Sequence, residues 1–175
     1  MQEAATMTRP DLERAPKYFH GYINTVKEND LTSAFEQQEK SFIPFLESLP
    51  VEKRDYRYAE NKWTIKEMLQ HIIDAERVFS YRALCFARKD ETPLPSFDEN
   101  EYAARSKSEK REWHDMLEEY KSLRKASELM FRSFDNEQLD STGTASGKSN
   151  YVLAIGFVLV GHVSHHVNII KERYL

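Results

Sequence analysis

The stretch that decides the fold is residues 64–88, TIKEMLQHIIDAERVFSYRALCFAR. Apolar residues recur in it every three or four positions, which is the spacing of one face of an α-helix. Thr64 and Glu67 have the spacing of a capping box, in which the hydroxyl and the carboxylate satisfy backbone N–H groups that the first turn leaves free. The apolar face is wide enough to touch two neighbouring helices. The sequence therefore predicts a long helix inside a helical bundle.

Three further segments show the same periodicity and predict the rest of the bundle. One covers about residues 30–49, where we expect Pro44 to kink or cut the helix. Another covers about residues 108–134, with apolar residues at heptad-like spacing. The last begins near Asn150 and runs to near the C-terminus, after a Ser-, Thr- and Gly-rich segment, residues 140–149, which we expect to be a loop.

The remaining segments indicate the topology and the domain limits. The chain has only 5 glycines and lacks the β-branched runs of strands, so we predict an all-α protein, a four-helix bundle. Residues 89–107 are long for a hairpin connection and favour a crossover between the second and third helices. Residues 1–29 precede an Asp30 helix cap and are expected to form a partly ordered arm. We predict one bundle domain over residues 30–175.

Composition excludes several classes of function. The chain has 25 Lys and Arg against 29 Asp and Glu, without the basic excess that nucleic-acid binding needs. Its single cysteine cannot form an internal disulfide, and the N-terminal residues lack an apolar signal segment, so a cytoplasmic protein is expected. Residues 149–170 carry no Lys, Arg, Asp or Glu, but a membrane span would expose histidines to lipid. We interpret this stretch as a buried helix and expect no membrane partner.

The strongest signal of chemistry is a cluster of histidines, GHVSHH at residues 161–166. His162 and His166 are four residues apart, so one helical face presents both imidazoles, and the apolar residues along that face direct it to the core. Buried imidazoles need a partner, and a divalent metal supplies one because neutral imidazole is its commonest nitrogen ligand. His71, on the broad apolar face of residues 64–88, is the best candidate for a third ligand.

The same residues allow a second interpretation. An i, i+4 histidine pair is often a hydrogen-bonded structural pair, and the spacing is less specific than a His-Glu-x-x-His motif. His20 and His114 are expected to be solvated surface histidines. Cys85 lies in an apolar stretch and is expected to be a small core residue.

Three charged residues near His71 are candidates for a supporting role. Glu67 and Asp74 lie one turn on either side of it, close enough to orient a ligand or accept a proton, although ion pairing on the helix surface explains them equally. Arg82 lies about three turns further along the same side, roughly 16 Å away, where it could border a cavity but not reach a metal.

Two motifs of this sequence resemble those of the DinB/YfiT-like superfamily. Residues 62–77, KWTIKEMLQHIIDAER, are similar to its helix-two signature, and GHVSHH at residues 161–166 is similar to its second signature. The resemblance extends in order over most of residues 18–175. It implies a four-helix bundle with an up-down-down-up course and a divalent metal, often zinc or nickel, held by three histidines. Position by position, it carries those ligands to His71, His162 and His166.

One departure limits what the resemblance implies about substrates. In the founding branch of the family, Arg-Gly-Gln follows the histidine pair, whereas this chain has Val167-Asn168-Ile169. His165 matches an additional histidine that is frequent in the family. The substrate of the founding branch therefore does not carry over.

The resemblance also implies a set of functions. Some relatives are thiol S-transferases that use bacillithiol, mycothiol or glutathione, and others are described as metal-dependent hydrolases. We predict a metal-dependent thiol S-transferase that acts on a small molecule, with a low-molecular-weight thiol as cosubstrate. The alternatives are a metal-dependent hydrolase, a non-catalytic metal-binding or dimerisation module, and a metal-free binder of small molecules. A homodimer is expected from the resemblance and from the aromatic arm at residues 18–22.

Overall fold

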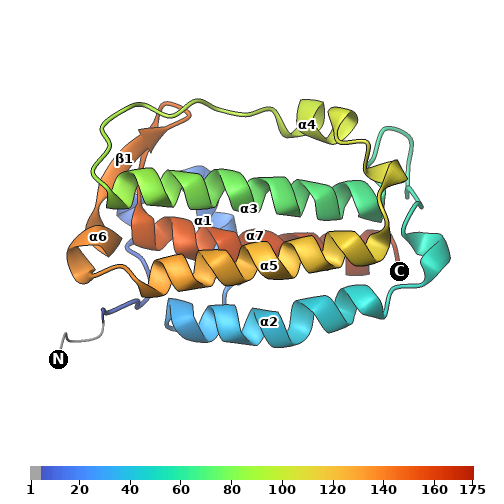
Figure 1. Ribbon diagram of the computed structural model, residues 1–175, viewed down its shortest axis with the longest axis horizontal. Helices are drawn as coiled ribbons and strands as arrows, with labels where there is room; N and C mark the ends of the chain where they lie inside the picture. Colours follow the sequence, from blue (N-terminus) through green and yellow to red (C-terminus); the bar gives the residue numbers. More distant parts are fainter. Residues whose placement is uncertain (1–4) are drawn as a thin grey trace.

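The computed structural model describes residues 5–175, most of which are helical (Figure 1). The prediction of a helical bundle is confirmed, and α3 begins at the predicted capping box: Thr64 Oγ1 accepts a hydrogen bond from the Glu67 backbone N–H, and the Glu67 carboxylate accepts one from the Thr64 backbone N–H. Asp30 caps α2, which continues through Pro44 without being cut. The four long helices are α2 (Leu31–Glu47), α3 (Ile65–Ala87), α5 (Trp113–Arg132) and α7 (Val152–Arg173).

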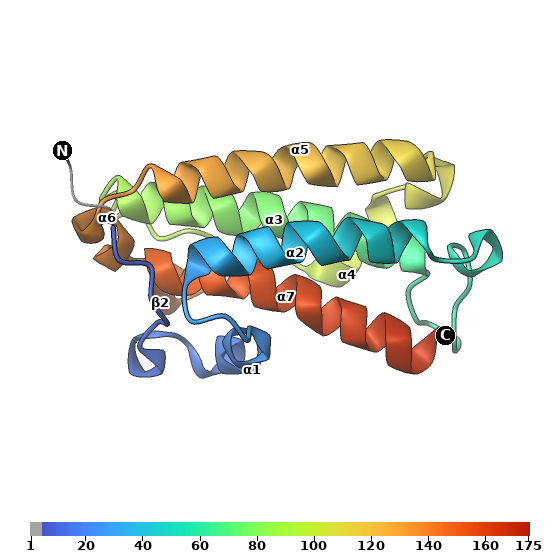
Figure 2. The same cartoon turned by 90° about the horizontal axis from the view of Figure 1, so that it is seen from below.

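In this bundle α2 and α7 run in one direction, and α3 and α5 run in the other (Figures 1 and 2). The segment that joins α3 to α5 runs back along the bundle over α3 and contains the short helix α4 (Glu99–Arg105). Contacts within or beside the helices fix these directions. Gln70 of α3 contacts Arg111, just before α5, and Ser80 contacts Ser127 of α5. Glu36–Arg132 and Phe42–Tyr120 join α2 to α5. Trp63, just before α3, contacts Tyr174, just after α7, and His71 contacts His162 of α7.

The helix α7 forms the centre of the fold. Almost every residue from Val152 to Val163 is buried, which agrees with its uncharged sequence. It is long and apolar enough to span a membrane, but 67% of its most apolar window is buried inside the protein. Its burial favours the interpretation of a core helix over a membrane span.

The N-terminal arm contains an additional helix, α1 (Lys17–Thr25), which packs on α7 (Figure 2). The close approach depends on Gly161, because a Cβ atom there would lie 2.0 Å from the Tyr22 carbonyl oxygen. Thr25 Oγ1 also donates hydrogen bonds to the carbonyl oxygens of Tyr22 and Gly161. Residues 1–4 of the predicted arm lie outside the described residues.

One prediction about the segment before α7 is wrong. Residues 140–149 are not simply a loop, because β1 (Thr142–Ala145) pairs with β2 (Lys148–Tyr151) in an antiparallel hairpin, so this mostly helical protein also contains two short strands. Its turn residues Ser146 and Gly147 both have positive φ angles, of 53° and 67°, which matches the twist of a two-residue hairpin. The short helix α6 (Asn136–Asp140) precedes the hairpin, and α7 follows it.

Candidate metal centre

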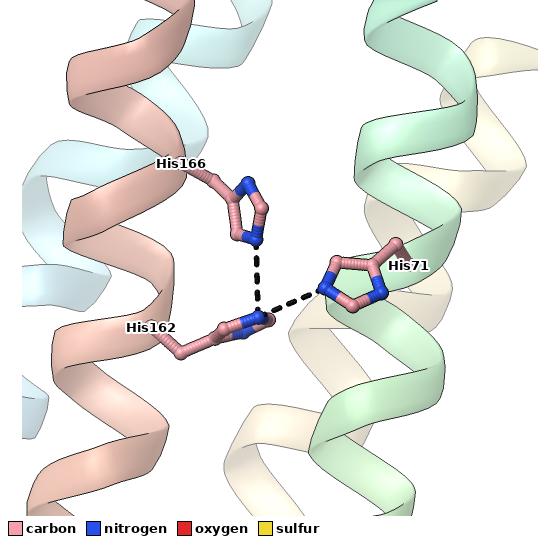
Figure 3. A group of neighbouring side chains, drawn as sticks. All are labelled: His71, His162 and His166. Carbon is pink, nitrogen blue, oxygen red and sulfur yellow. Dashed lines mark hydrogen bonds between the residues drawn. The ribbon is translucent and has the colours of Figure 1, made fainter. Parts of the chain in front are cut away.

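Three histidines from two helices meet inside the bundle (Figure 3). His162 and His166 lie one turn apart on α7, and His71 faces them from α3. The Nε2 atom of His162 is 2.9 Å from Nε2 of His71 and 3.0 Å from Nε2 of His166. These separations are close to the roughly 3.3 Å between two nitrogens that occupy tetrahedral positions on one ion at about 2.0–2.1 Å. The donor set therefore fits a small divalent cation.

The three side chains are almost entirely enclosed, with exposed fractions of 8% for His71, 5% for His162 and 7% for His166. The indole of Trp63 lies against His71, with ring centroids 4.8 Å apart. Tyr22 of α1 contacts His162 edge to face, with ring centroids 5.4 Å apart. Aromatic packing therefore holds the rings of His71 and His162 in place.

Burial also determines the protonation of the cluster. It lowers the pKa of His71 to about 4, since the charged imidazolium loses hydration inside the protein. Burial lowers the pKa of His162 and His166 well below the usual value, and repulsion between the neighbouring imidazoles adds to the effect. All three rings are therefore neutral at pH 7, which is the form that ligates metals.

Hydrogen bonding alone does not account for this arrangement. A neutral imidazole Nε2 carries either one hydrogen or one lone pair, so the Nε2 of His162 cannot make two full hydrogen bonds to its two neighbours. Nδ1 of His166 is buried and has no hydrogen-bond partner among the described residues. A cation between the three Nε2 atoms would use all three lone pairs at once, whereas the purely hydrogen-bonded alternative leaves one contact unexplained.

The histidines lie at the wall of a cavity of about 490 Å³. That volume is in the range of pockets that hold small organic molecules. Its walls are mostly apolar and come from α1, α3, α7, the segment between α3 and α5, and the hairpin. The aromatic lining residues are Tyr18, Phe19, Tyr22, Trp63, Phe79, Phe86 and Phe97.

The other predicted site residues lie apart from the histidines. The Glu67 carboxylate serves the capping box and pairs with Arg57, which is the surface ion pair expected as its alternative role. Asp74 accepts a hydrogen bond from Gln70, and burial raises its pKa. Neither carboxylate lines the cavity, whereas Arg82 does.

The remaining histidines and the cysteine lie outside the cluster. His165 is half-buried against Tyr22, at 5.2 Å between ring centroids. His114 is exposed as predicted, but His20 is half-buried and its Nε2 lies 3.0 Å from the Ala15 carbonyl oxygen. Cys85 is buried, in agreement with the prediction of a small core residue.

Sequence reasoning missed the residues that enclose the cluster. Trp63 lies immediately before the Thr64 cap of α3, and its indole packs against His71. The role of Tyr22 was hidden because its helix lies far from α7 in the sequence. The hairpin could have been found from the Ser146-Gly147 turn between two Thr- and Ser-containing segments.

Comparisons with known proteins agree with this architecture. The sequence matches the model of the DinB superfamily over residues 34–170. Among solved structures, the chain is similar to YfiT from Bacillus subtilis, with a TM-score of 0.67 and 18% identity over 93% of this chain and 89% of that one. That protein is described as a probable metal-dependent hydrolase with an unusual four-helix bundle topology. A search of curated proteins gave no match.

Proposed function

Since the chain belongs to the DinB superfamily, we propose that it is a metal-dependent enzyme whose ligands are His71, His162 and His166. The observation that carries this proposal is the convergence of three neutral, buried imidazoles at the wall of a cavity large enough for a small molecule. Three protein ligands leave further coordination positions for a substrate atom, as in catalytic zinc sites. Zinc and nickel are the metals that we propose.

The reaction that we propose is transfer of a low-molecular-weight thiol to a small electrophile. The thiol loses its proton to solvent, its sulfur bonds to the electrophilic carbon, and the leaving group departs with the electrons of the broken bond. A bound divalent metal would supply Lewis acidity and lower the pKa of a thiol or water next to it. The mostly apolar walls suit this chemistry because a poorly hydrated thiolate is a strong nucleophile and a dry site protects the electrophile from water.

The residues of the chain itself have three roles in this scheme. The rings of Trp63 and Tyr22 keep His71 and His162 oriented, since Trp63 packs against His71 and Tyr22 packs against His162. The ring centroid of Phe79 lies 6.0 Å from that of His162, and both residues line the cavity. The helix α1 closes the wall and excludes water from the nucleophile.

Hydrolysis is the second candidate, and the description of YfiT favours it. In that case water takes the place of the thiol as nucleophile. A hydrolase commonly uses a carboxylate as general base beside its metal. Glu67 and Asp74 do not line the cavity, and Glu99, which does, is exposed and lies on α4 rather than on a helix that carries the histidines. We therefore place thiol transfer first. A homodimer and a cytoplasmic location remain proposals that accompany either reaction.

Metal content tests the site directly. Elemental analysis of the untagged protein, as isolated and after loading with zinc or nickel, should give about one ion per chain. The double variant His71→Ala, His166→Ala should hold none, whereas His114→Ala, which removes an exposed histidine, should match the wild type. Circular dichroism establishes that each variant is folded. Absence of metal from the loaded wild type, or its retention in the double variant, would contradict the proposal.

Activity assays then separate the two reactions. The loaded protein is incubated with an alkylating electrophile and glutathione, bacillithiol or mycothiol, and the loss of free thiol is followed. A parallel assay without thiol follows the hydrolysis of activated esters and amides. Thiol consumption that disappears in the double variant supports transfer. Hydrolysis without thiol dependence identifies the second candidate.

A further inference from the structure

Arg82 is a buried charge without a counter-charge. Only 6% of its surface is exposed, yet none of the ion pairs formed by residues 5–175 involves it. Burial disfavours the charged form and lowers the pKa of Arg82, but a guanidinium remains protonated at neutral pH. An unpaired charge in the interior costs free energy, so this position calls for an explanation beyond packing.

Its hydrogen bonds explain only part of the side chain. Nη2 donates to the Pro95 carbonyl oxygen at 2.9 Å and to Ser146 Oγ at 3.0 Å, which ties the crossover segment and the hairpin to α3. The described residues provide no hydrogen-bond acceptor for Nε or Nη1. These two nitrogens are nevertheless not fully enclosed, so a ligand or water can reach them. A neutral amide could make the same two contacts without burying a charge. The structure therefore leaves two donors and a positive charge available.

The position of Arg82 directs these two donors and the charge toward the cavity that the three histidines also line. Arg82 follows His71 by eleven residues, which is close to three helical turns, so both lie on the same face of α3, roughly 16 Å apart along the helix. Ala75, Phe79 and Phe86 continue that face, and the whole stripe lines the cavity. The guanidinium carbon lies 5.8 Å from the Phe79 ring and 6.0 Å from the Phe97 ring. The cavity thus has imidazoles toward one end, an arginine toward the other and aromatic rings between them.

Two other charged residues line the cavity, Lys148 and Glu99. Both are exposed, so water screens their opposite charges. Arg82 is the buried charge of this wall, and it has the planar donor geometry that matches a carboxylate.

We propose that Arg82 binds the carboxylate of an organic acid whose apolar body lies along the aromatic wall of the cavity. With the proposed function as its premise, the inference extends to catalysis: the substrate is an aryl or alkyl carboxylate whose reactive carbon, remote from the carboxylate, reaches the three histidines. Arg82 would then be the residue that sets the specificity for an anion, while the histidines hold the metal.

Calorimetric titration with 4-phenylbutyrate and with its neutral analogue 4-phenylbutan-1-ol tests the inference, because the two probes differ only in the charged group. The wild type should bind the acid at least about tenfold more tightly than the alcohol, as expected for a charge-assisted contact. Arg82→Gln should reduce that ratio to near one with little change in affinity for the alcohol, and Arg82→Lys should retain part of it.

The matched control is Arg88→Gln, which removes the same charge from an exposed position six residues further along, beside Phe134 and outside the cavity lining. It should keep the wild-type preference. Equal affinity of the wild type for both probes, no binding of either probe, or an unchanged preference in Arg82→Gln would overturn the inference.

Metal content is measured on each variant, and Arg82→Gln should keep that of the wild type. A wild type that binds metal but does not prefer the acid over the alcohol would contradict only the anion site. A wild type that prefers the acid but binds no metal would contradict only the proposed metal-dependent enzyme.

Discussion

Arg124 and Arg82 are equally buried, each with 6% of its surface exposed, but their surroundings differ. Arg124 lies between the helices of the bundle, where its Nη2 is 2.8 Å from the Glu76 carboxylate and its guanidinium covers the rings of Phe35 and Tyr120. Arg82 has no carboxylate partner among residues 5–175 and lines the large cavity. One charge is neutralised within the fold, and the other is left for a ligand.

The helix α3 contributes to both environments, the charge pair between the helices and the unpaired charge at the cavity. Glu76 faces α5 and the closed side of the bundle, whereas His71 and Arg82 face the cavity. A charge that is paired in the interior is explained by the fold itself. An unpaired charge and three buried imidazoles that line one cavity mark a place where the fold sacrifices stability, which is the expected signature of a binding site.

The largest expected effect on the free energy of unfolding is at the Glu76–Arg124 pair, on the closed side of the bundle. Glu76→Gln leaves the Arg124 guanidinium buried without a counter-charge and should lower the free energy of unfolding by about 3–5 kcal/mol. Urea denaturation measures the change. Glu119→Gln, which removes a partly exposed partner of Arg77 and Arg111, should cost less than about 1 kcal/mol.

The double variant Glu76→Leu, Arg124→Met sharpens the same test. It removes both charges together with the Arg124 Nε and Nη1 atoms, which are enclosed without hydrogen-bond partners. Its stability should return to within about 1 kcal/mol of the wild type or exceed it. If Glu76→Gln costs no more than Glu119→Gln, the pair does not have the structural role assigned to it.

An intermediate effect is expected where α1 covers the cavity. Gly161→Ala places a methyl group 2.0 Å from the Tyr22 carbonyl oxygen, and backbone cannot rotate away as a side chain can. We expect a loss of about 1–3 kcal/mol in the free energy of unfolding, with faster hydrogen exchange in α1. Gly21→Ala is the matched control, because its Cβ meets nothing within 4 Å on an exposed face of α1. It should be neutral or stabilise by less than about 1 kcal/mol. Equal effects of the two variants would show that α1 is not held against α7.

The local features of the fold could be predicted from the sequence. The Thr64–Glu67 capping box and the Asp30 cap depend on residues within one turn, and both are present. The shared face of His162 and His166 follows from helical spacing in the same way, and both are buried. Such signals work because the interacting groups are neighbours in the chain, so that no tertiary information is required.

What could not be predicted depends on contacts between distant segments. The Ser146-Gly147 turn marks the hairpin in the sequence, but not its position against α3, which depends on contacts such as that of Arg82 with Ser146. The covering of His162 by Tyr22 depends on the approach of α1 to Gly161, which no local pattern encodes. Helical spacing in the sequence placed Arg82 on the correct side of its helix. Whether a carboxylate lies opposite Arg82 could be seen only in the three-dimensional structure.

The smallest expected effect is at Arg82 itself, and it tests the comparison most directly. Arg82→Met loses two hydrogen bonds, to the Pro95 carbonyl oxygen and Ser146 Oγ, but it also removes a buried charge that has no counter-charge in the described part of the chain. The lost bonds and the recovered hydration penalty oppose each other, so we expect the free energy of unfolding to stay within about 1 kcal/mol of the wild type. Urea denaturation of the ligand-free protein measures it. A loss above about 3 kcal/mol in the free energy of unfolding would place Arg82 with Arg124 among the structural charges. Stabilisation of the fold would then explain the buried charge without a ligand.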